Sequence, residues 1–337
     1  MPLFLLFIFD YKKKKRIFAP EEKYYIMKVE NLIFSEQKVE RLKLPTISVV
    51  VHLHLFYLDL IPDFLKYLRH IPVPFSLLIS IPEGVVADDN DVKKLFCILS
   101  NMREIIIKHT PNKGRDIAPM LCSFAEEIQK YDVLLHLHTK KTLHHKDMLE
   151  GWLKHILEHL LPSDICIISI LSRLSRDAGM IIPPDFVSYN VAFDSWGTPK
   201  NLAIAQDVMT RGGLNINLKK EYPEIVYPEG GMFWACTEYL HRLFALGLTY
   251  DDFPEEPIGI DGTIAHALER LYCLWGIDGE KKVFRTYFFE SEQTVTRRLA
   301  KERWYFIGKN RKHLMMCRIL GVLCLVLFVL LLISIFI

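Results

Sequence analysis

The stretch that decides the fold runs from Glu104 to Thr142 and reads EIIIKHTPNKGRDIAPMLCSFAEEIQKYDVLLHLHTKKT. It starts with a β-branched run, Ile105–Ile107, which stops at the turn-forming residues Pro111 to Gly114. Apolar residues then recur at helical spacing from about Asp116, and a second apolar run, Val133–Leu135, follows. The order strand, loop, helix, strand is the building unit of a parallel sheet covered by helices.

The loop after the first of these strands carries the polar cluster NKGRD, Asn112 to Asp116. Ligands of such sheets bind at the carboxyl ends of the strands, which is where this cluster lies. Gly114 just before a helix start favours a turn whose backbone N–H groups face an anion or a ribose, with Lys113 and Arg115 adding positive charge. The other interpretation is an ordinary turn in which Asp116 caps the helix. The residues alone favour neither.

A second polar cluster, HLHTKK, begins at the end of the next strand. His136 and His138 are two residues apart and therefore share one face of the strand, which Lys140 continues. Cationic and imidazole donors at a strand's carboxyl end suit a diphosphate. Two alternatives remain: zinc binding together with His144 and His145, or partly buried histidines beside a solvated lysine.

Composition sets limits on the class of protein. Half of the 337 residues are hydrophobic and the net charge is +2, so the chain can build one large domain or two small ones, and no global field selects nucleic acid. The sequence contains no G-x-G-x-x-G, P-loop, H-E-x-x-H or G-x-S-x-G motif. The seven cysteines include no C-x-x-C pair, which favours reduced, mostly buried thiols in the cytosol.

Periodicity predicts further elements on both sides of the opening stretch. We expect strands at 46–51 and 75–81 and helices at 58–68 and 88–100 before it. After it we expect helices at 146–161 and 163–174, a strand at 179–183, a loop-rich insertion at 185–230 with a helix near 199–210, a strand at 232–235, and helices at 237–246 and from 261. The sequence therefore predicts an α/β fold with a mostly parallel sheet.

Three carboxylates are candidates for a general base. Glu255 and Glu256 lie in an acidic loop between two predicted helices, and Asp261 stands at the start of the second. A carboxylate there can take a proton from a hydroxyl group. The other interpretation of Asp261 is a helix N-cap, and the two are compatible. We place Asp261 first, because a helix start fixes its geometry, and Glu256 second.

The segment PEGGMFWA and the helix after Asp261 supply candidate acceptor contacts. Gly231 allows a sugar to approach closely, and Trp234 offers a stacking face, although core packing is the alternative for this tryptophan. His266 falls on the helix face that does not carry the apolar stripe.

Both ends of the chain differ from its middle. Residues 319–337 are apolar and uncharged, and their length comes close to spanning a bilayer core of roughly 30 Å. Basic residues precede them, so we expect a C-terminal anchor with the folded domain in the cytoplasm; a buried core helix is the alternative. Residues 1–40 are interpreted as an extension that contacts a membrane surface through its basic run or remains solvated.

Four motifs, TPNKGRDIAPML, YDVLLHLHTKK, PEGGMFWA and DDFPEEPIGIDGTIAHALERL, occur here in the order seen in rhamnan synthesis protein F. The chain resembles this family of rhamnosyltransferase-like proteins over roughly residues 45–285. The resemblance implies a glycosyltransferase fold of the GT-A kind, with a Rossmann-like sheet at residues 41–290. The basic segment at 291–318 and the expected membrane helix at 319–337 lie outside the resemblance. That fold usually carries an Asp-x-Asp after the fourth strand to hold a divalent metal, and here His136 to Lys140 stands in its place.

The resemblance also implies a function and a site. It implies transfer of a deoxyhexose such as rhamnose from a dTDP-sugar to a polysaccharide or lipid-linked acceptor at the bacterial inner membrane. Without Asp-x-Asp we expect no resident cofactor, with Mg²⁺ or Mn²⁺ as the alternative. Nucleotide-sugar contacts are expected from Asn112, Gly114, Arg115, Asp116, His136, His138 and Lys140, and acceptor contacts from Gly231, Trp234 and His266. A non-catalytic carbohydrate- or partner-binding protein on the same fold is the second hypothesis.

Overall fold

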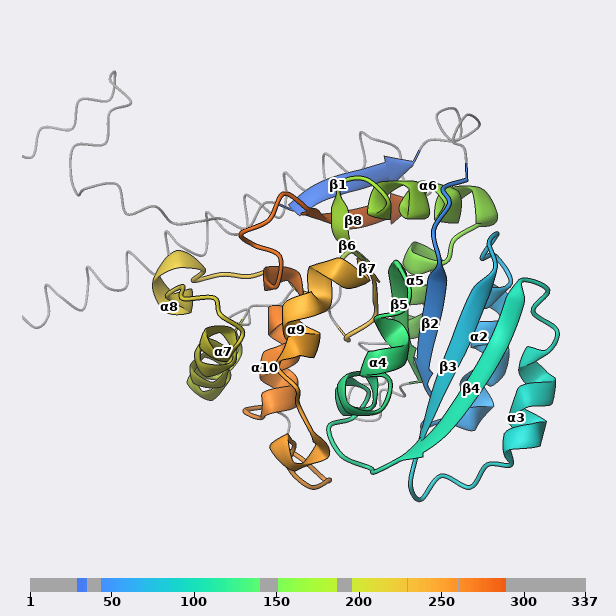
Figure 1. The fold of residues 1–337 in the computed structure, drawn as a ribbon, viewed down its shortest axis with the longest axis horizontal. Coiled ribbons are helices and arrows are strands. Elements are labelled where there is room, and N and C mark those ends of the chain that lie inside the picture. Colours follow the sequence, from blue (N-terminus) through green and yellow to red (C-terminus); the bar gives the residue numbers. More distant parts are fainter. Residues whose placement is uncertain are drawn as a thin grey trace, which may run out of the picture.

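The structure is a computed structural model that describes residues 29–34, 44–139, 151–186, 196–228, 230–259 and 261–288. These residues form one eight-stranded sheet in the order β1-β8-β6-β7-β5-β2-β3-β4, with helices on both of its faces (Figure 1). The predicted α/β class with a mostly parallel sheet is therefore confirmed. The predicted membrane helix at 319–337, the basic segment before it and Lys140, His144 and His145 lie outside the described residues.

The amino-terminal half is parallel throughout. It contains β2 (Val49–His54), β3 (Phe75–Pro82), β4 (Met102–Thr110) and β5 (Val133–His138), and β2 lies between β3 and β5. The connections carry α2 (Ile61–Leu68), α3 (Asp89–Phe96), a π-helical turn (Pro119–Ser123) and α4 (Ala125–Ile128). All four strands lie where the sequence predicts them, and each extends beyond the predicted apolar run at its carboxyl end.

The carboxyl-terminal half completes the sheet. Its helices are α5 (Trp152–Leu160), α6 (Asp164–Leu174), α7 (Pro199–Arg211), α8 (Leu218–Glu221), α9 (His241–Ala245) and α10 (Ile264–Leu271), and its strands are β6 (Ala178–Ile182), β7 (Phe233–Cys236) and β8 (Lys282–Phe288). β7 runs antiparallel to both β5 and β6, whereas β8 is parallel to β6. The chain therefore re-enters the sheet beside β5 from the opposite direction.

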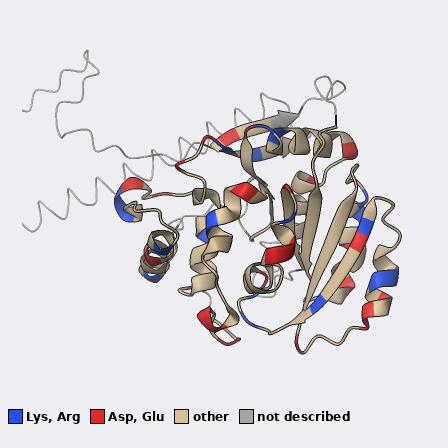
Figure 2. Cartoon of the chain, in the orientation of Figure 1, with Lys and Arg blue, Asp and Glu red and all other residues tan. Residues whose placement is uncertain are grey.

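Two hydrophobic layers hold the helices on the sheet. One layer packs α2, α3, α5 and α6 against one face, and the other packs the π-helical turn, α4, α7, α9 and α10 against the opposite face. Consecutive strand residues alternate between the layers, as in Val49 and Val50 of β2. Charged residues are accordingly rare on the central strands, whereas the ribbon of the edge strand β4 carries the colours of basic and acidic residues in Figure 2. β4 contains Arg103, Glu104 and Lys108.

Local capping chemistry fixes two helix starts as the sequence predicts. The Asp88 side chain accepts hydrogen bonds from the amides of Asn90 and Asp91 at the start of α3. The Ser163 hydroxyl accepts one from the amide of Cys166 at the start of α6. Both caps replace hydrogen bonds that the first turn of a helix cannot make internally.

Three features differ from the expectation. Residues 29–34, inside the predicted extension, form β1, which pairs in parallel with β8 at the edge of the sheet, and β8 itself was not predicted. The short amphipathic patterns of these two strands are too weak to indicate a strand by themselves. The last helix begins at Ile264 with Thr263 as its N-cap residue, so Asp261 lies before the helix and does not cap it.

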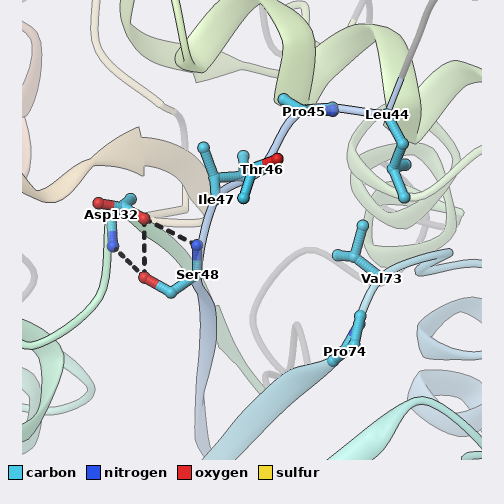
Figure 3. A pocket seen from close by; sticks show the side chains of 8 residues that line it. All are labelled: Leu44, Pro45, Thr46, Ile47, Ser48, Val73, Pro74 and Asp132. Carbon is cyan, nitrogen blue, oxygen red and sulfur yellow. Dashed lines mark hydrogen bonds between the residues drawn. The ribbon is translucent and has the colours of Figure 1, made fainter.

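A shallow hollow lies at the amino ends of β2 and β3 (Figure 3). Asp132 is the carboxylate in its lining, and its Oδ2 accepts hydrogen bonds from the amide and hydroxyl of Ser48 at 2.7 and 2.8 Å. The remaining lining residues are mostly apolar, namely Leu44, Pro45, Thr46, Ile47, Val73 and Pro74. This hollow is at the opposite end of the strands from the polar clusters and contains no group suited to chemistry.

No single helix in the described ranges is long and apolar enough to cross a bilayer. Helices α5 and α6 are long and apolar enough only when taken together, and their axes are bent by 68° relative to each other.

Trp234 of β7 provides a test of this packing. Its side chain is fully buried, and its indole N–H donates to the carbonyl of Leu160 at 2.8 Å. Replacing it with alanine leaves a large cavity, so we expect Trp234→Ala to lower the free energy of unfolding by about 3–5 kcal/mol in chemical denaturation. Phe56→Ala, at a side chain that is 40% exposed, is the control and should change it by under about 0.5 kcal/mol. Equal effects of the two variants would contradict a structural role for Trp234.

Candidate active site

The site lies where the strand order reverses. The chain moves outward from β2 to β3 and β4 and then returns to place β5 on the other side of β2. Open α/β sheets bind their ligands outside the carboxyl ends of the strands at such a switch point. β2 and β5 pair in register, so that His52 lies beside His136 and His54 beside His138.

The strand face at this point changes from apolar to polar along its length. Val50 and Leu134 occupy the amino-terminal half of the face that packs against the π-helical turn and α10, and Leu78 lies beside His52 farther along the same face. The carboxyl-terminal half of the same face carries a set of buried polar residues: His52, His54, Ser80, His136 and His138. A sheet face that buries five polar side chains must supply them with hydrogen bonds.

The hydrogen bonds form one connected line. His136 Nε2 lies 3.1 Å from Asp116 Oδ2, and His136 Nδ1 lies 2.9 Å from His52 Nδ1. His52 Nε2 is 3.1 Å from Ser80 Oγ, which is 2.9 Å from His54 Nδ1. The rings of His52 and His136 stack with their centroids 5.0 Å apart. Sequence reasoning predicts Asp116 and His136 as site residues, and the structure brings them together.

The NKGRD loop places Asp116 through unusual backbone geometry. Gly114 has φ of 65° and Arg115 has φ of 56°, and Arg115 is the one non-glycine residue with positive φ in the described chain. A Cβ on Gly114 would lie 2.5 Å from Ala118 and from Phe253, so only glycine fits. A non-glycine residue in this region costs about 1–3 kcal/mol, and such strain clusters at functional sites.

Some backbone N–H groups of this loop already donate hydrogen bonds within the loop. Ile117 N–H and Ala118 N–H both donate to the carbonyl of Gly114 at 3.1 Å, and Lys113 N–H donates to Pro111. The loop can therefore offer an anion the amides of Gly114, Arg115 and Asp116. Asn112 and Arg115 lie at its surface, and both are exposed.

The turn before β7 closes on the histidine face. Gly230 and Gly231 both have positive φ, at 86° and 76°. A Cβ on Gly231 would lie 3.2 Å from Asp116 Oδ2 and 3.8 Å from His138 Nε2, which places this glycine directly beside the carboxylate. The ring N–H of His138 donates to the carbonyl of Gly230, and the amide of Gly230 donates to Glu269 Oε1 at 3.1 Å. Gly231 and the NKGRD loop, predicted separately as acceptor and nucleotide contacts, are therefore neighbours in the structure.

The acidic loop contacts the NKGRD loop. Lys113 and Glu255 form an isolated antiparallel bridge, and Lys113 Nζ lies 2.9 Å from Glu255 Oε1. Glu255 is otherwise exposed. Glu256 is half-buried: its Oε2 accepts from the amide of Ile258 at 2.9 Å, and its buried Oε1 has no hydrogen-bond partner among the described residues.

Asp261 is enclosed by donors. Its carboxylate accepts hydrogen bonds from the Asn201 side chain, from the amides of Thr198 and Gly262 at 3.2 and 3.1 Å, and from Arg270, which lies 3.4 Å away. Burial alone would raise the pKa of Asp261, but the Asn201 hydrogen bond and the Arg270 charge outweigh burial and lower it. This carboxylate links the start of α7 to α10 and is a poor proton acceptor.

The remaining predicted acceptor residues are buried. Trp234 lies in the opposite hydrophobic layer, away from the histidines, because adjacent residues of β7 face opposite sides of the sheet. Its neighbour Phe233 faces the site instead, with its ring 5.4 Å from that of His136. His266 is 5% exposed, and its Nδ1 lies 2.8 Å from the Thr263 hydroxyl.

Burial determines the charge states of the histidine face. It lowers the pKa of His54 to about 3 and that of His52 well below its usual range, with neighbouring histidines adding to the effect. Both rings are therefore neutral near pH 7. Burial would raise the pKa of Asp116, but His138 and the hydrogen-bonded His136 outweigh it and lower this pKa below its ordinary value. Asp116 is therefore ionised near pH 7.

Sequence reasoning missed His52, His54, Ser80 and Glu269. The signal for the first two is present, because the tripeptide His-Leu-His ends both β2 and β5. Two strands with the same polar ending indicate neighbours at one sheet edge. Within the described ranges no group of three or more His, Cys, Asp or Glu side chains is arranged to hold a metal ion.

Comparisons with known proteins identify the family of the chain. A family model described as rhamnan synthesis protein F matches residues 12–280, somewhat further toward the amino terminus than the motifs indicate. The chain belongs to the rhamnan synthesis protein F family. It is also 29% identical over 234 residues to proteins named "Uncharacterized protein WxcX" from two strains of Xanthomonas campestris pv. campestris. The match covers 67% of this chain and 31% of those relatives, so the chain spans about a third of their length. Membership of this family associates the protein with polysaccharide synthesis.

The buried neutral histidines predict a pH-dependent stability. The folded-state pKa of His54, about 3, lies below its value of 6.5 in an unfolded chain, so between these values the unfolded state binds a proton that the folded state does not. Stability is therefore retained above pH 6.5 and is lost as the pH falls toward 3. His54 should contribute up to about 1.4 kcal/mol per pH unit, with His52 adding a loss of the same sign. Urea unfolding at pH 7, 6 and 5 measures this slope.

The variant His54→Gln provides the comparison. It lacks one titrating ring, so its stability should fall less steeply between pH 6.5 and 5 than that of the unchanged protein. An identical slope in both proteins would contradict neutral burial of His54.

Proposed function

We propose that this protein is a glycosyltransferase of the GT-A kind that transfers a deoxyhexose such as rhamnose from a dTDP-sugar to a cell-surface polysaccharide or lipid-linked glycan. The observation that carries the proposal is the ionised Asp116 at the switch point, next to Gly231 and held by His136. A carboxylate beside a residue without a side chain is suited to accept hydroxyl groups of a ribose or a sugar.

The neighbouring loop supplies what a nucleotide diphosphate needs. Asn112, the amides of Gly114, Arg115 and Asp116, and the Arg115 side chain converge on one loop at the carboxyl ends of the strands. We place the nucleotide there, with Lys140 directed to the diphosphate in the place where related transferases carry a metal-binding Asp-x-Asp. His138 holds the Gly230 carbonyl, so its role is to fix the glycine turn beside the sugar. Mg²⁺ or Mn²⁺ at the diphosphate remains the alternative to Lys140.

The transfer step needs one proton acceptor. The acceptor hydroxyl oxygen forms a bond to the anomeric carbon, the bond from that carbon to the diphosphate oxygen breaks, and the diphosphate leaves with the electron pair. The hydroxyl proton passes to a carboxylate. Among the three candidates we now place Glu256 first, because its Oε1 has no partner among the described residues, whereas Asp261 already accepts from four groups and Glu255 pairs with Lys113.

We also propose that the protein acts at a membrane. The uncharged segment 319–337 behind its basic flank would anchor the chain with the transferase domain in the bacterial cytoplasm, close to a lipid-linked acceptor. The second candidate function is a binding protein on the same fold without catalysis. The dense hydrogen bonding of Asp261 favours it, because a carboxylate that already accepts from four groups is a poor proton acceptor.

Donor binding tests the proposed site. We expect dTDP-rhamnose to bind the full-length protein in detergent, and Asp116→Asn to weaken that binding by roughly 5- to 150-fold, which corresponds to losing about 1–3 kcal/mol of charged hydrogen bonding. Asp91→Asn, on exposed α3, is the control and should bind as the unchanged protein does. Titration calorimetry with dTDP-rhamnose, dTDP and UDP gives the affinities. Equal binding by Asp116→Asn and the unchanged protein would rule out this placement of the ligand.

Release of dTDP from dTDP-rhamnose, with water as acceptor, tests the base. We expect Glu256→Gln to slow it by roughly 10²–10⁴ while leaving donor affinity nearly unchanged. Asp261→Asn should lose stability and activity together. If Asp261→Asn instead stays as stable as the unchanged protein but loses turnover, Asp261 is the base; if neither variant affects turnover, neither carboxylate is the base. Binding of dTDP-rhamnose by the unchanged protein without any release of dTDP would favour the binding function.

A further inference from the structure

With Asp116 ionised and all three imidazoles neutral, the buried line of hydrogen bonds allows only one placement of its protons. Its members are Asp116 from the NKGRD loop, His136 from β5, His52 from β2, Ser80 from β3 and His54 from β2, joined in that order. Each contact is between 2.9 and 3.1 Å, so each needs one donor and one acceptor.

The assignment starts at the carboxylate. An ionised Asp116 can only accept, so His136 carries its proton on Nε2 and has a lone pair on Nδ1. His52 then donates to that lone pair from Nδ1, which leaves its Nε2 as an acceptor. The Ser80 hydroxyl donates to this nitrogen and accepts from Nδ1–H of His54. Every bond of the line therefore points toward Asp116.

Any other tautomer breaks the line. If His52 carried its proton on Nε2, its bare Nδ1 would face the bare Nδ1 of His136. His136 would have to move its proton to Nδ1 to restore that bond, and its bare Nε2 would then face the negative charge of Asp116. All three imidazoles and Ser80 are at most 5% exposed, so water is poorly placed to repair such a mismatch.

We propose that His52, Ser80 and His54 are positioning residues: they hold His136 as its Nε2–H tautomer, and His136 thereby keeps Asp116 an anion open to hydroxyl groups of the ligand. Other groups face the same carboxylate. The rings of His138 and His54 lie close enough to Asp116 to affect its pKa. Tyr272 is also close to Asp116 and to Glu269, and its fully buried hydroxyl has no hydrogen-bond partner among the described residues. The identity of the ligand rests on the proposed function, whereas the proton assignment does not.

Nitrogen-15 NMR of histidine-labelled full-length protein reads the tautomers directly. At pH 7 we expect neutral rings with the proton on Nδ1 in His52 and His54 and on Nε2 in His136. Finding His136 protonated on Nδ1, or charged, at this pH overturns the proposal without any variant.

Ser80→Ala tests the positioning effect, and Ser76→Ala is its matched control. Both serines lie on the same face of β3, but the Ser76 hydroxyl accepts from Tyr131 and is outside the line. We expect Ser80→Ala to mix the tautomers of His52 and His136 and to weaken dTDP-rhamnose binding roughly three- to tenfold. Ser80→Thr, which retains a hydroxyl, should restore both, and Ser76→Ala should change neither.

The outcomes separate the two claims. Unchanged tautomers and affinity in a folded Ser80→Ala protein overturn the positioning role. If the unchanged protein shows the expected tautomers but does not bind dTDP-rhamnose, the proposed donor is wrong and the ligand role of Asp116 falls with it. If Ser80→Ala does not fold, the spectra of the unchanged protein and of Ser80→Thr still decide the proton assignment.

Discussion

The in-register pairing of β2 with β5 is the constraint on which the rest of the site depends. It sets His52 against His136 and His54 against His138 on one buried face, where four positive charges could not be tolerated. Burial keeps His52 and His54 neutral, and neutral imidazoles in an apolar layer require partners for both ring nitrogens. Ser80 is the hydrogen-bond partner of His52 Nε2, and Asp116 is the partner of His136 Nε2.

Asp116 is held in place by features that are unfavourable when considered alone. The loop before it contains two residues with left-handed backbone conformation, one of which is Arg115, and Gly114 is crowded by Phe253. A buried carboxylate is also costly unless donors surround it. The structure offsets both costs with the same contacts, because the loop that bends sharply at Gly114 brings Asp116 within reach of His136. The backbone strain at Gly114 and Arg115 and the burial of the Asp116 carboxylate therefore both follow from the position of Asp116 beside His136.

The sequence located most helices and strands but not the edge pair β1 and β8, and it did not predict which strands lie side by side. Apolar runs and caps located β3, α6 and α7 closely, because burial and capping are local properties. The direction of β7 was not predictable, since an apolar run such as MFWA has no polarity of its own. The register of β7 decides which residues face the site: it pairs Phe233 with His136 on the site face and buries Trp234 on the far side. Asp261 was misjudged for a related reason, because its donors come from Asn201 and Thr198, sixty residues earlier.

The antiparallel entry of β7 also explains why the site needs both halves of the chain. A parallel strand beside β5 would begin at the amino end of the sheet and carry its preceding turn away from the histidines. An antiparallel strand begins at the carboxyl ends of its neighbours, so the turn before β7 delivers Gly230 and Gly231 to His138 and Asp116. Glu269 of α10 then holds the amide of Gly230. Because Asp261 and Arg270 fix α10 against α7, a side chain outside the histidine face determines how closely the glycine turn approaches it.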